Sequence, residues 1–188
     1  MDQESSLRNH LLIAMPAMRD PNFHHTVTYI CEHNENGAIG IIINRPMTLQ
    51  LQYIFDQMNI SSSSNQTSGE APVLFGGPIQ HDRGFIIHRP AGHWNASLAV
   101  TEDIAITTSQ DILQAIAKNE GPDDILVALG YAGWGAQQLE QEMLNNTWLS
   151  CPANMELLFE TPFTQRWQGS GTLMGIDLNT LSGDAGHA

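Results

Sequence analysis

Residues 124–142 read DILVALGYAGWGAQQLEQE, and this stretch decides the expected fold. Its continuous apolar start is typical of a buried strand. Glycines follow at positions 130, 133 and 135, and glycine permits the positive φ angles and close backbone approach that a sharp reversal requires. The end of the stretch is rich in glutamine and glutamate, which favour a helix over 136–144. We therefore expect a buried strand, a sharp turn within 130–135 and a helix.

Two aromatic residues, Tyr131 and Trp134, lie between these glycines and allow three interpretations. Both rings can pack into the core, with the glycines letting them turn inward. They can instead form an aromatic surface for a protein partner. In the third interpretation, backbone amides at the start of the 136–144 helix bind a phosphate or carboxylate. The spacing G-x-x-G-x-G is not a dinucleotide fingerprint and no P-loop lysine follows, so the third interpretation is the weakest.

The sequence before this stretch predicts a sheet built mainly from adjacent strands. The pair Asn36-Gly37 is a strong hairpin signal between two segments rich in β-branched residues. Few helices separate the strands, so we expect a single α+β domain over 1–188, with a mixed, largely antiparallel sheet flanked by a few helices. The expected strands span residues 10–15, 25–32, 38–44, 72–75, 84–88, 96–100 and 104–107.

Helices and loops are predicted from capping residues and apolar spacing. Thr48 can cap a helix whose apolar face includes Leu51 and Phe55, and Ser109 can cap a second helix that Gly121 ends. A short helical turn is expected at 155–159. The polar segments are expected to be a flexible loop at 61–69, a loop at 169–171 and a frayed tail at 182–188.

The charge balance limits the classes of partner. Asp and Glu number 20 against 7 Lys and Arg, the formal net charge is −13, and the basic residues are scattered. This distribution disfavours direct binding of nucleic acid or of an anionic membrane surface. The acidic start resembles no secretory signal, and no apolar run is long enough to span a bilayer. We therefore expect a cytoplasmic protein with free thiols at Cys31 and Cys151.

Few residue patterns indicate catalysis or metal binding. The 8 histidines form no H-E-x-x-H motif and no zinc-finger spacing, so no metal site is predicted. Cys31 and His33 would share one face of a regular strand, which makes a thiol nucleophile one hypothesis and a buried Cys31 the other. Glu140 and Glu142 would point about 200° apart on a helix and cannot form one acid–base dyad. No catalytic residue and no cofactor is predicted.

A candidate binding surface lies at the ends of predicted strands, where ligand groups often sit in open sheets. It comprises Asn44, Arg45, Gly76, Gly77, Pro78, Tyr131 and Trp134, provided that the strand ends meet at one edge. Arg45 could pair with a carboxylate or phosphate. The alternative is a local salt bridge or hydrogen bonds to turn carbonyls.

Several motifs occur in order over most of the chain. They are Leu11–Pro16 (LLIAMP), Asp20–Phe23 (DPNF), Glu32-His33, Gly37–Pro46 (GAIGIIINRP), Gly76-Gly77-Pro78, Gly130–Gly135 (GYAGWG), Gln138–Glu140 (QLE) and Trp148. Together they resemble the YqgE/AlgH family of small bacterial proteins, although this chain has Gln137 where the family usually carries glycine. The resemblance implies a cytoplasmic protein with a curved, partly barrel-like sheet. It implies no agreed activity or catalytic residues, and some members are labelled regulators of transcription, notably of alginate production.

Two functional hypotheses follow. The first is a binding or regulatory protein that acts through a protein partner or a small ligand, with any effect on transcription being indirect. The alternative is an enzyme or a small-anion-binding protein with a cleft around Arg45 and the turn at 130–135. An exposed aromatic surface would favour a protein partner, and a concave pocket around Arg45 would favour a ligand. The sequence predicts no oligomeric state.

Overall fold

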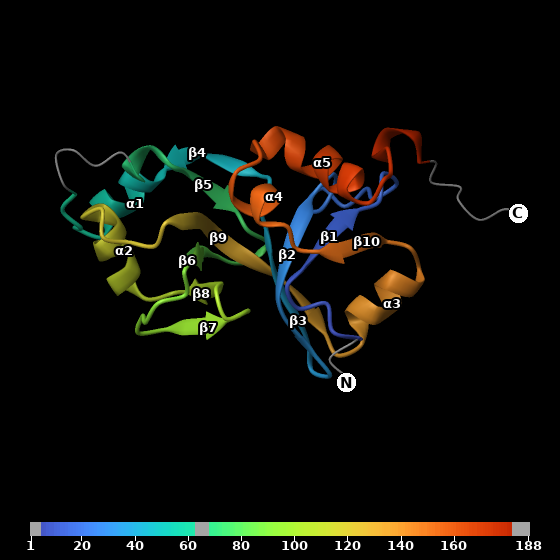
Figure 1. The fold of residues 1–188 in the computed structure, drawn as a ribbon, viewed down its shortest axis with the longest axis horizontal. Coiled ribbons are helices and arrows are strands. Elements are labelled where there is room, and N and C mark those ends of the chain that lie inside the picture. Colours follow the sequence, from blue (N-terminus) through green and yellow to red (C-terminus); the bar gives the residue numbers. More distant parts are fainter. Residues whose placement is uncertain (1–4, 63–67, 182–188) are drawn as a thin grey trace, which may run out of the picture.

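A curled sheet organises the computed structural model, which describes residues 5–62 and 68–181 (Figure 1). Its strands run in the order β10-β1-β2-β3-β9-β6-β8-β7, while β5 joins β4 to β9. The β5–β9 pair is parallel and the other pairs are antiparallel, which confirms the predicted single α+β domain with a curved, largely antiparallel sheet. The strands are β1 (His10–Ala14), β2 (Val27–Asn34), β3 (Gly37–Ile42), β4 (Pro46–Gln50), β5 (Pro72–Phe75), β6 (Ile79–Arg89), β7 (Ser97–Ala99), β8 (Ala105–Thr107), β9 (Asp124–Gly135) and β10 (Trp148–Pro152).

Helices cover both faces of the sheet (Figure 1). They are α1 (Leu51–Gln57), α2 (Gln110–Ala117), α3 (Gln138–Leu144), α4 (Met155–Phe159) and α5 (Arg166–Leu173), with short 3-10 helices η2 (Ser68–Glu70), η3 (Phe163–Gln165) and η4 (Leu178–Thr180). The largest apolar cluster fills the inner face of the curled sheet and is covered by α4 and α5. Two smaller clusters lie on the outer face, one under α1 and α2 and the other under α3.

The β2–β3 hairpin confirms the prediction from Asn36-Gly37, because Asn34 pairs with Gly37 across a tight turn. The apolar spacing of α1 and α2 is also confirmed, since Leu51, Phe55 and Ile112 are fully buried. These elements follow from local sequence signals that tertiary packing reinforces.

The prediction of a sharp turn within 130–135 is wrong. This segment is the second half of β9, which pairs with β6 and β5 along its first half and with β3 along its second half. Because β3 pairs with residues 132–135 and Ile79 of β6 pairs with Tyr131, the glycines continue the strand instead of ending it. The reversal comes later, at Gln137, which has a φ of 62° and precedes α3.

Three further local predictions differ from the structure. Thr48 lies in strand β4, and α1 begins after Gln50 without a side-chain cap. The glycine-rich segment 169–171 lies inside α5, where Ser170 is buried and donates a hydrogen bond to the Arg166 carbonyl, so it is not a loop. Within the predicted loop at 61–69, Ser68 begins η2, while residues 63–67 and the predicted frayed tail lie outside the described residues.

Candidate functional site

The segment Gly76-Gly77-Pro78 and the middle of β9 pack backbone against backbone. A Cβ atom on Gly77 would lie 2.1 Å from the carbonyl carbon of Tyr131, and one on Gly130 would lie 2.3 Å from the Gly77 oxygen. Gly130 also has a φ of +79°, which favours glycine. The structure therefore brings two of the predicted surface segments together, with no space for side chains between them.

Asn44 and Arg45 lie directly after β3, beside these glycines. The Phe75 N–H donates to the Arg45 carbonyl at 2.8 Å. The guanidinium of Arg45 donates to three backbone carbonyls, those of Pro21, Asn22 and His24, each at 2.7 Å. Burial lowers the pKa of this guanidinium. Arg45 therefore fixes the loop between β1 and β2, and its role in ligand binding stays a prediction.

The two aromatic residues of the predicted surface point to opposite faces of β9. Tyr131 packs on the inner face, where its ring meets Phe85 edge-on at a centroid distance of 5.4 Å. Trp134 lies on the outer face, is only 7 % exposed and contacts Phe23 and Trp148. Tyr131 and Trp134 are three residues apart, so strand alternation separates them. They do not form one shared aromatic surface.

The inner face of the curled sheet holds an apolar hollow of about 310 Å³. Its walls come from parts of the chain that are distant in sequence, the β2–β3 hairpin and the strands β6 to β8. Ile39 and Leu98 remain 36 % and 38 % exposed at this hollow, although both are large apolar side chains. The apolar hollow is lined mainly by Cys31, Ile39, Ile41, Phe85, Leu98 and Ile106.

A β-bulge decides which residues of β2 face the apolar hollow. The register of β2 against β3 passes from Ile30 to Glu32 and leaves Cys31 as an extra residue. Cys31 lines the apolar hollow in regular alternation after Tyr29. The bulge moves His33 to the outer face, where its Nε2 donates to Glu140 at 2.5 Å. The expectation that positions 31 and 33 share one face is wrong, because the bulge shifts the alternation by one residue.

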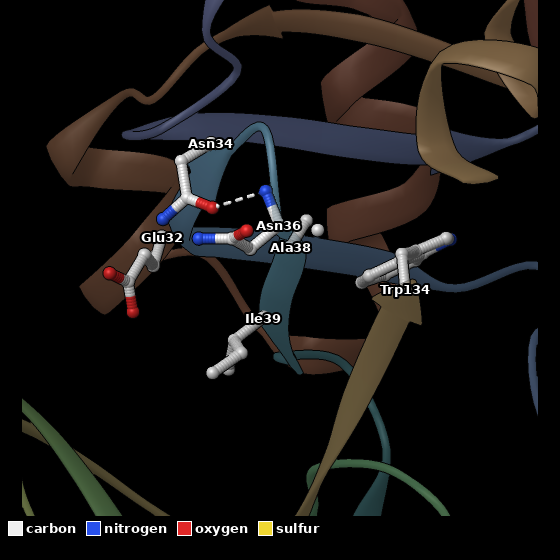
Figure 2. Close-up of a pocket in the computed structure, with 7 residues that line it drawn as sticks. Glu32, Asn34, Asn36, Ala38, Ile39 and Trp134 are labelled. Carbon is white, nitrogen blue, oxygen red and sulfur yellow. Dashed lines mark hydrogen bonds between the residues drawn. The ribbon is translucent and has the colours of Figure 1, made fainter. Parts of the chain in front are cut away.

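A second, smaller hollow of about 190 Å³, called the polar hollow below, adjoins the first at Ile39 and combines polar side chains with Ala38, Ile39 and Trp134 (Figure 2). Figure 2 shows Glu32 and Ile39 on the same side of the hairpin, consistent with their direct pairing between β2 and β3. Asn34 Oδ1 accepts a hydrogen bond from the Asn36 N–H at 2.8 Å. Glu32 makes no ion pair with any described residue. This polar hollow therefore presents a carboxylate and two amides.

The electrostatics of the apolar hollow do not suit nucleophilic chemistry. Burial raises the pKa of the Cys31 thiol far above its usual range, and the nearby Glu32 carboxylate raises it further. The Cys31 thiol donates to the Tyr29 carbonyl at 3.5 Å. Because the thiolate is the reactive form, a thiol held protonated is inert. The arrangement can bind an apolar group but provides no activated nucleophile.

Titratable groups also meet on the outer face, near α3. His33 Nδ1 accepts from the Leu7 N–H at 2.8 Å, so its Nε2 carries the proton donated to Glu140. Burial raises the pKa of Glu142, although contacts with the indoles of Trp134 and Trp148 oppose the shift. Glu140 is paired with His33, whereas Glu142 lies near the indoles, so the two carboxyls do not act as a dyad.

Apart from Cys31, no lining residue of the apolar hollow is given a functional role by the sequence. Ile39 and Ile41 are typical of the core of a hairpin, and Leu98 belongs to a short strand without a distinctive motif. Their grouping depends on contacts between segments more than 40 residues apart, which local patterns do not report.

The curled, largely antiparallel sheet with an apolar hollow on its inner face defines a small α+β half-barrel protein. The chain belongs to the AlgH-like family, whose sequence profile matches residues 11–179. The predicted resemblance to the YqgE/AlgH family is therefore confirmed.

Relatives support this assignment along the whole chain. A UPF0301 protein of Thioalkalivibrio sulfidiphilus is 55 % identical over 188 residues, which cover 100 % of both chains. A UPF0301 protein of Legionella pneumophila is 53 % identical over 184 residues, covering 98 % of both. The solution structure of the AlgH protein from Pseudomonas aeruginosa has a TM-score of 0.80 at 43 % identity and covers 100 % of this chain and 99 % of that one.

A more distant structure shows the fold alone. The crystal structure of protein DIP2367 from Corynebacterium diphtheriae has a TM-score of 0.74 at 17 % identity and covers 95 % of this chain and 92 % of that one. Among the helices of residues 5–62 and 68–181, none is long and apolar enough to cross a membrane. The same residues contain no group of three or more His, Cys, Asp or Glu side chains placed to hold a metal ion.

Proposed function

We propose that this chain is a cytoplasmic binding protein whose apolar hollow takes the hydrophobic part of a small ligand. The observation that carries the proposal is the partial exposure of Ile39 and Leu98 at a concave, mainly apolar site. Ligand sites are typically concave and apolar with a few polar groups at the margin. Any effect on transcription would then be indirect and would follow from ligand or partner binding.

The chemistry of the hollow supports binding over catalysis. The Cys31 thiol is buried and held protonated, and the other main lining side chains are apolar. An enzyme would need an acid, base or nucleophile within reach of the bound molecule. The alternative cleft around Arg45 has less support, because three backbone carbonyls already occupy that guanidinium.

Binding of an environment-sensitive fluorescent dye tests the proposal. We expect the wild-type protein to bind the dye, and Leu98→Glu to lose most of the signal because a carboxylate in the apolar hollow opposes apolar contact. The matched control is Leu173→Glu, which changes an exposed leucine at the end of α5 and should keep wild-type binding. Equal dye binding by wild type and Leu98→Glu would contradict the proposal.

A second candidate, a protein partner, is favoured by the position of β7. This strand is the last in the sheet order and borders the apolar hollow, so its outer edge has no strand partner within the described chain. An extended peptide could add to such an edge and place an apolar side chain in the hollow. Arg8 already donates to the Ala99 and Val100 carbonyls, which shortens the available edge. A partner of this kind should lose binding in Leu98→Glu and compete with the dye.

A further inference from the structure

Arg83 places a positive charge at the rim of the apolar hollow. It lies in β6, two residues before Phe85, and its Cζ atom is 5.6 Å from the centroid of the Phe85 ring, which lines the hollow. One guanidinium nitrogen of Arg83 also contacts the hydroxyl of Thr108 at 3.4 Å, and Thr108 is another lining residue. Two independent contacts therefore place the cation beside the opening.

The guanidinium of Arg83 is available to a ligand. Its other polar contact is with Gln80 at 3.3 Å, so both partners are neutral, at long distance and on the exposed surface. Exchanging such contacts for a carboxylate costs little, because neutral hydrogen bonds at this distance are weak. Arg89 differs, since it is paired with Asp124 at 2.8 Å.

We infer that the ligand is an amphipathic carboxylate, with its alkyl chain in the apolar hollow and its carboxylate on Arg83. This inference rests on the proposed function and adds the class of ligand. A planar guanidinium can hold a carboxylate through two parallel hydrogen bonds, and the Arg83 Cζ atom already lies over the Phe85 ring at the margin of the apolar hollow. The lining of the hollow supplies apolar contact and no competing charge.

The positions of the charged groups favour a carboxylate over the rival head group, an amine, because Arg83 contacts residues of the apolar hollow and Glu32 does not line it. Glu32 lies in the polar hollow, beyond Ile39, and its carboxylate would attract an ammonium group. The net charge of −13 makes the chain repel anions at long range. An anionic ligand therefore needs a local cation beside the apolar hollow in order to bind there. Arg83 meets this need because it contacts two lining residues directly.

Calorimetric titration with octanoate, octanol and octylamine tests the inference on the full chain. These probes share the alkyl chain and differ in the head group. We expect octanoate to bind roughly tenfold more tightly than octanol, since a charge-assisted contact contributes about 1.4 kcal/mol or more. Arg83→Gln should bind both probes equally, Arg83→Lys should keep part of the preference, and Glu32→Gln should behave as wild type. Unchanged thermal midpoints would show that the variants fold.

The outcomes separate the inference from the proposed function. If octanol and octanoate bind the wild type equally and Arg83→Gln changes neither, the carboxylate assignment fails while the binding function stands. Tightest binding of octylamine, lost in Glu32→Gln, would overturn the assignment and place the head group in the polar hollow. If none of the three probes binds, the proposed function itself fails.

Discussion

At the scale of single residues, Cys31 illustrates how the environment of a side chain overrides its intrinsic reactivity. Its side chain is fully buried on the inner face together with Val27 and Tyr29, and burial raises the pKa of its thiol. Cys151 is also buried, and burial raises the pKa of its thiol as well. His33 cannot activate Cys31, since it faces the other side of β2.

The first prediction concerns these thiols. We expect neither Cys31 nor Cys151 to react with iodoacetamide in the folded protein at pH 8, because almost no thiolate is present and the sulfur atoms are buried. Both should react completely in denaturant, as followed by mass spectrometry. Rapid modification of Cys31 alone would mean that the apolar hollow opens widely, and it would revive the nucleophile hypothesis.

The second prediction concerns Glu142, whose Oε2 atom is buried without a hydrogen-bond partner. Burial raises the pKa of this carboxyl above 4.5, so the folded state binds its proton more tightly than the unfolded state. The free energy of unfolding therefore falls as pH rises from 4.5 through the raised pKa. At pH 7 the carboxyl is ionised, and its burial destabilises the folded state. Glu142→Gln should raise the free energy of unfolding at pH 7 by about 1 kcal/mol.

Denaturant titration at several pH values measures this effect. The gain from Glu142→Gln should disappear below pH 4.5, where the wild-type carboxyl is protonated in both states. Glu120→Gln, at an exposed position after α2, provides the control and should change stability little at either pH. A destabilised Glu142→Gln at pH 7 would mean that the ionised carboxylate makes favourable contacts with the indoles of Trp134 and Trp148.

At the scale of secondary-structure elements, two glycines allow segments of the curled sheet to approach one another closely. Gly77 and Gly130 let the β5–β6 connection cross β9 at backbone contact distance. Gly130 also changes the alternation of β9, because Leu126 and Ala128 face the inner cluster whereas Ala132 faces the outer one. The positive φ of Gly130 thus lets the long strand β9 pair with β5 and β6 along its first half and with β3 along its second half.

The third prediction compares two glycines of neighbouring segments. Gly77→Ala should lower the free energy of unfolding by more than about 3 kcal/mol, because its Cβ would overlap the Tyr131 backbone and its φ of +155° is unfavourable for alanine. Gly84→Ala is the matched control, since a Cβ there has no atom within 4 Å. Thermal unfolding of both variants measures the difference. Similar stability of the two variants would mean that the two segments can move apart at this contact without a loss of stability.

How far the sequence predicts these elements depends on whether their cause is local. The β2–β3 hairpin and the helix after Ser109 were predictable, because a turn pair and apolar spacing specify them. The glycines of β9 indicate a turn when only neighbouring residues are considered, because their strand partners lie far away in sequence. The bulge at Cys31 has no sequence signature at all, and it decides which residues reach the hollow.

At the scale of the whole molecule, the candidate site exists only because distant parts of the sheet curl toward each other. The apolar hollow joins β3 to the β7–β8 hairpin, and Arg8 ties the N-terminal segment to that hairpin through the Ala99 and Val100 carbonyls. The predicted site at Arg45 lies at strand ends, whereas the hollow lies within the curled sheet. Curling of the sheet depends on contacts between residues far apart in the sequence, so local sequence patterns do not predict it.

The distribution of charge over the molecule leads to the fourth prediction, that the protein does not bind duplex DNA at physiological salt. DNA binding needs cations that are free to neutralise phosphates. Here the net charge is −13, and several arginines are engaged internally: Arg166 is buried and donates to the Ile43 carbonyl, and Arg89 pairs with Asp124. Arg83 alone at a groove cannot follow a phosphate backbone.

Fluorescence anisotropy of labelled duplexes measures this directly. We expect no binding by wild type at about 150 mM salt. At low salt the repulsion between the two anions is stronger, so binding should be no more than weak there as well. Binding that is tight, sequence-specific and lost as salt increases would contradict the prediction, and Arg83→Gln would then show whether the cation at the hollow takes part. If the protein binds octanoate but not DNA, any regulatory effect would depend on ligand binding and not on direct contact with DNA.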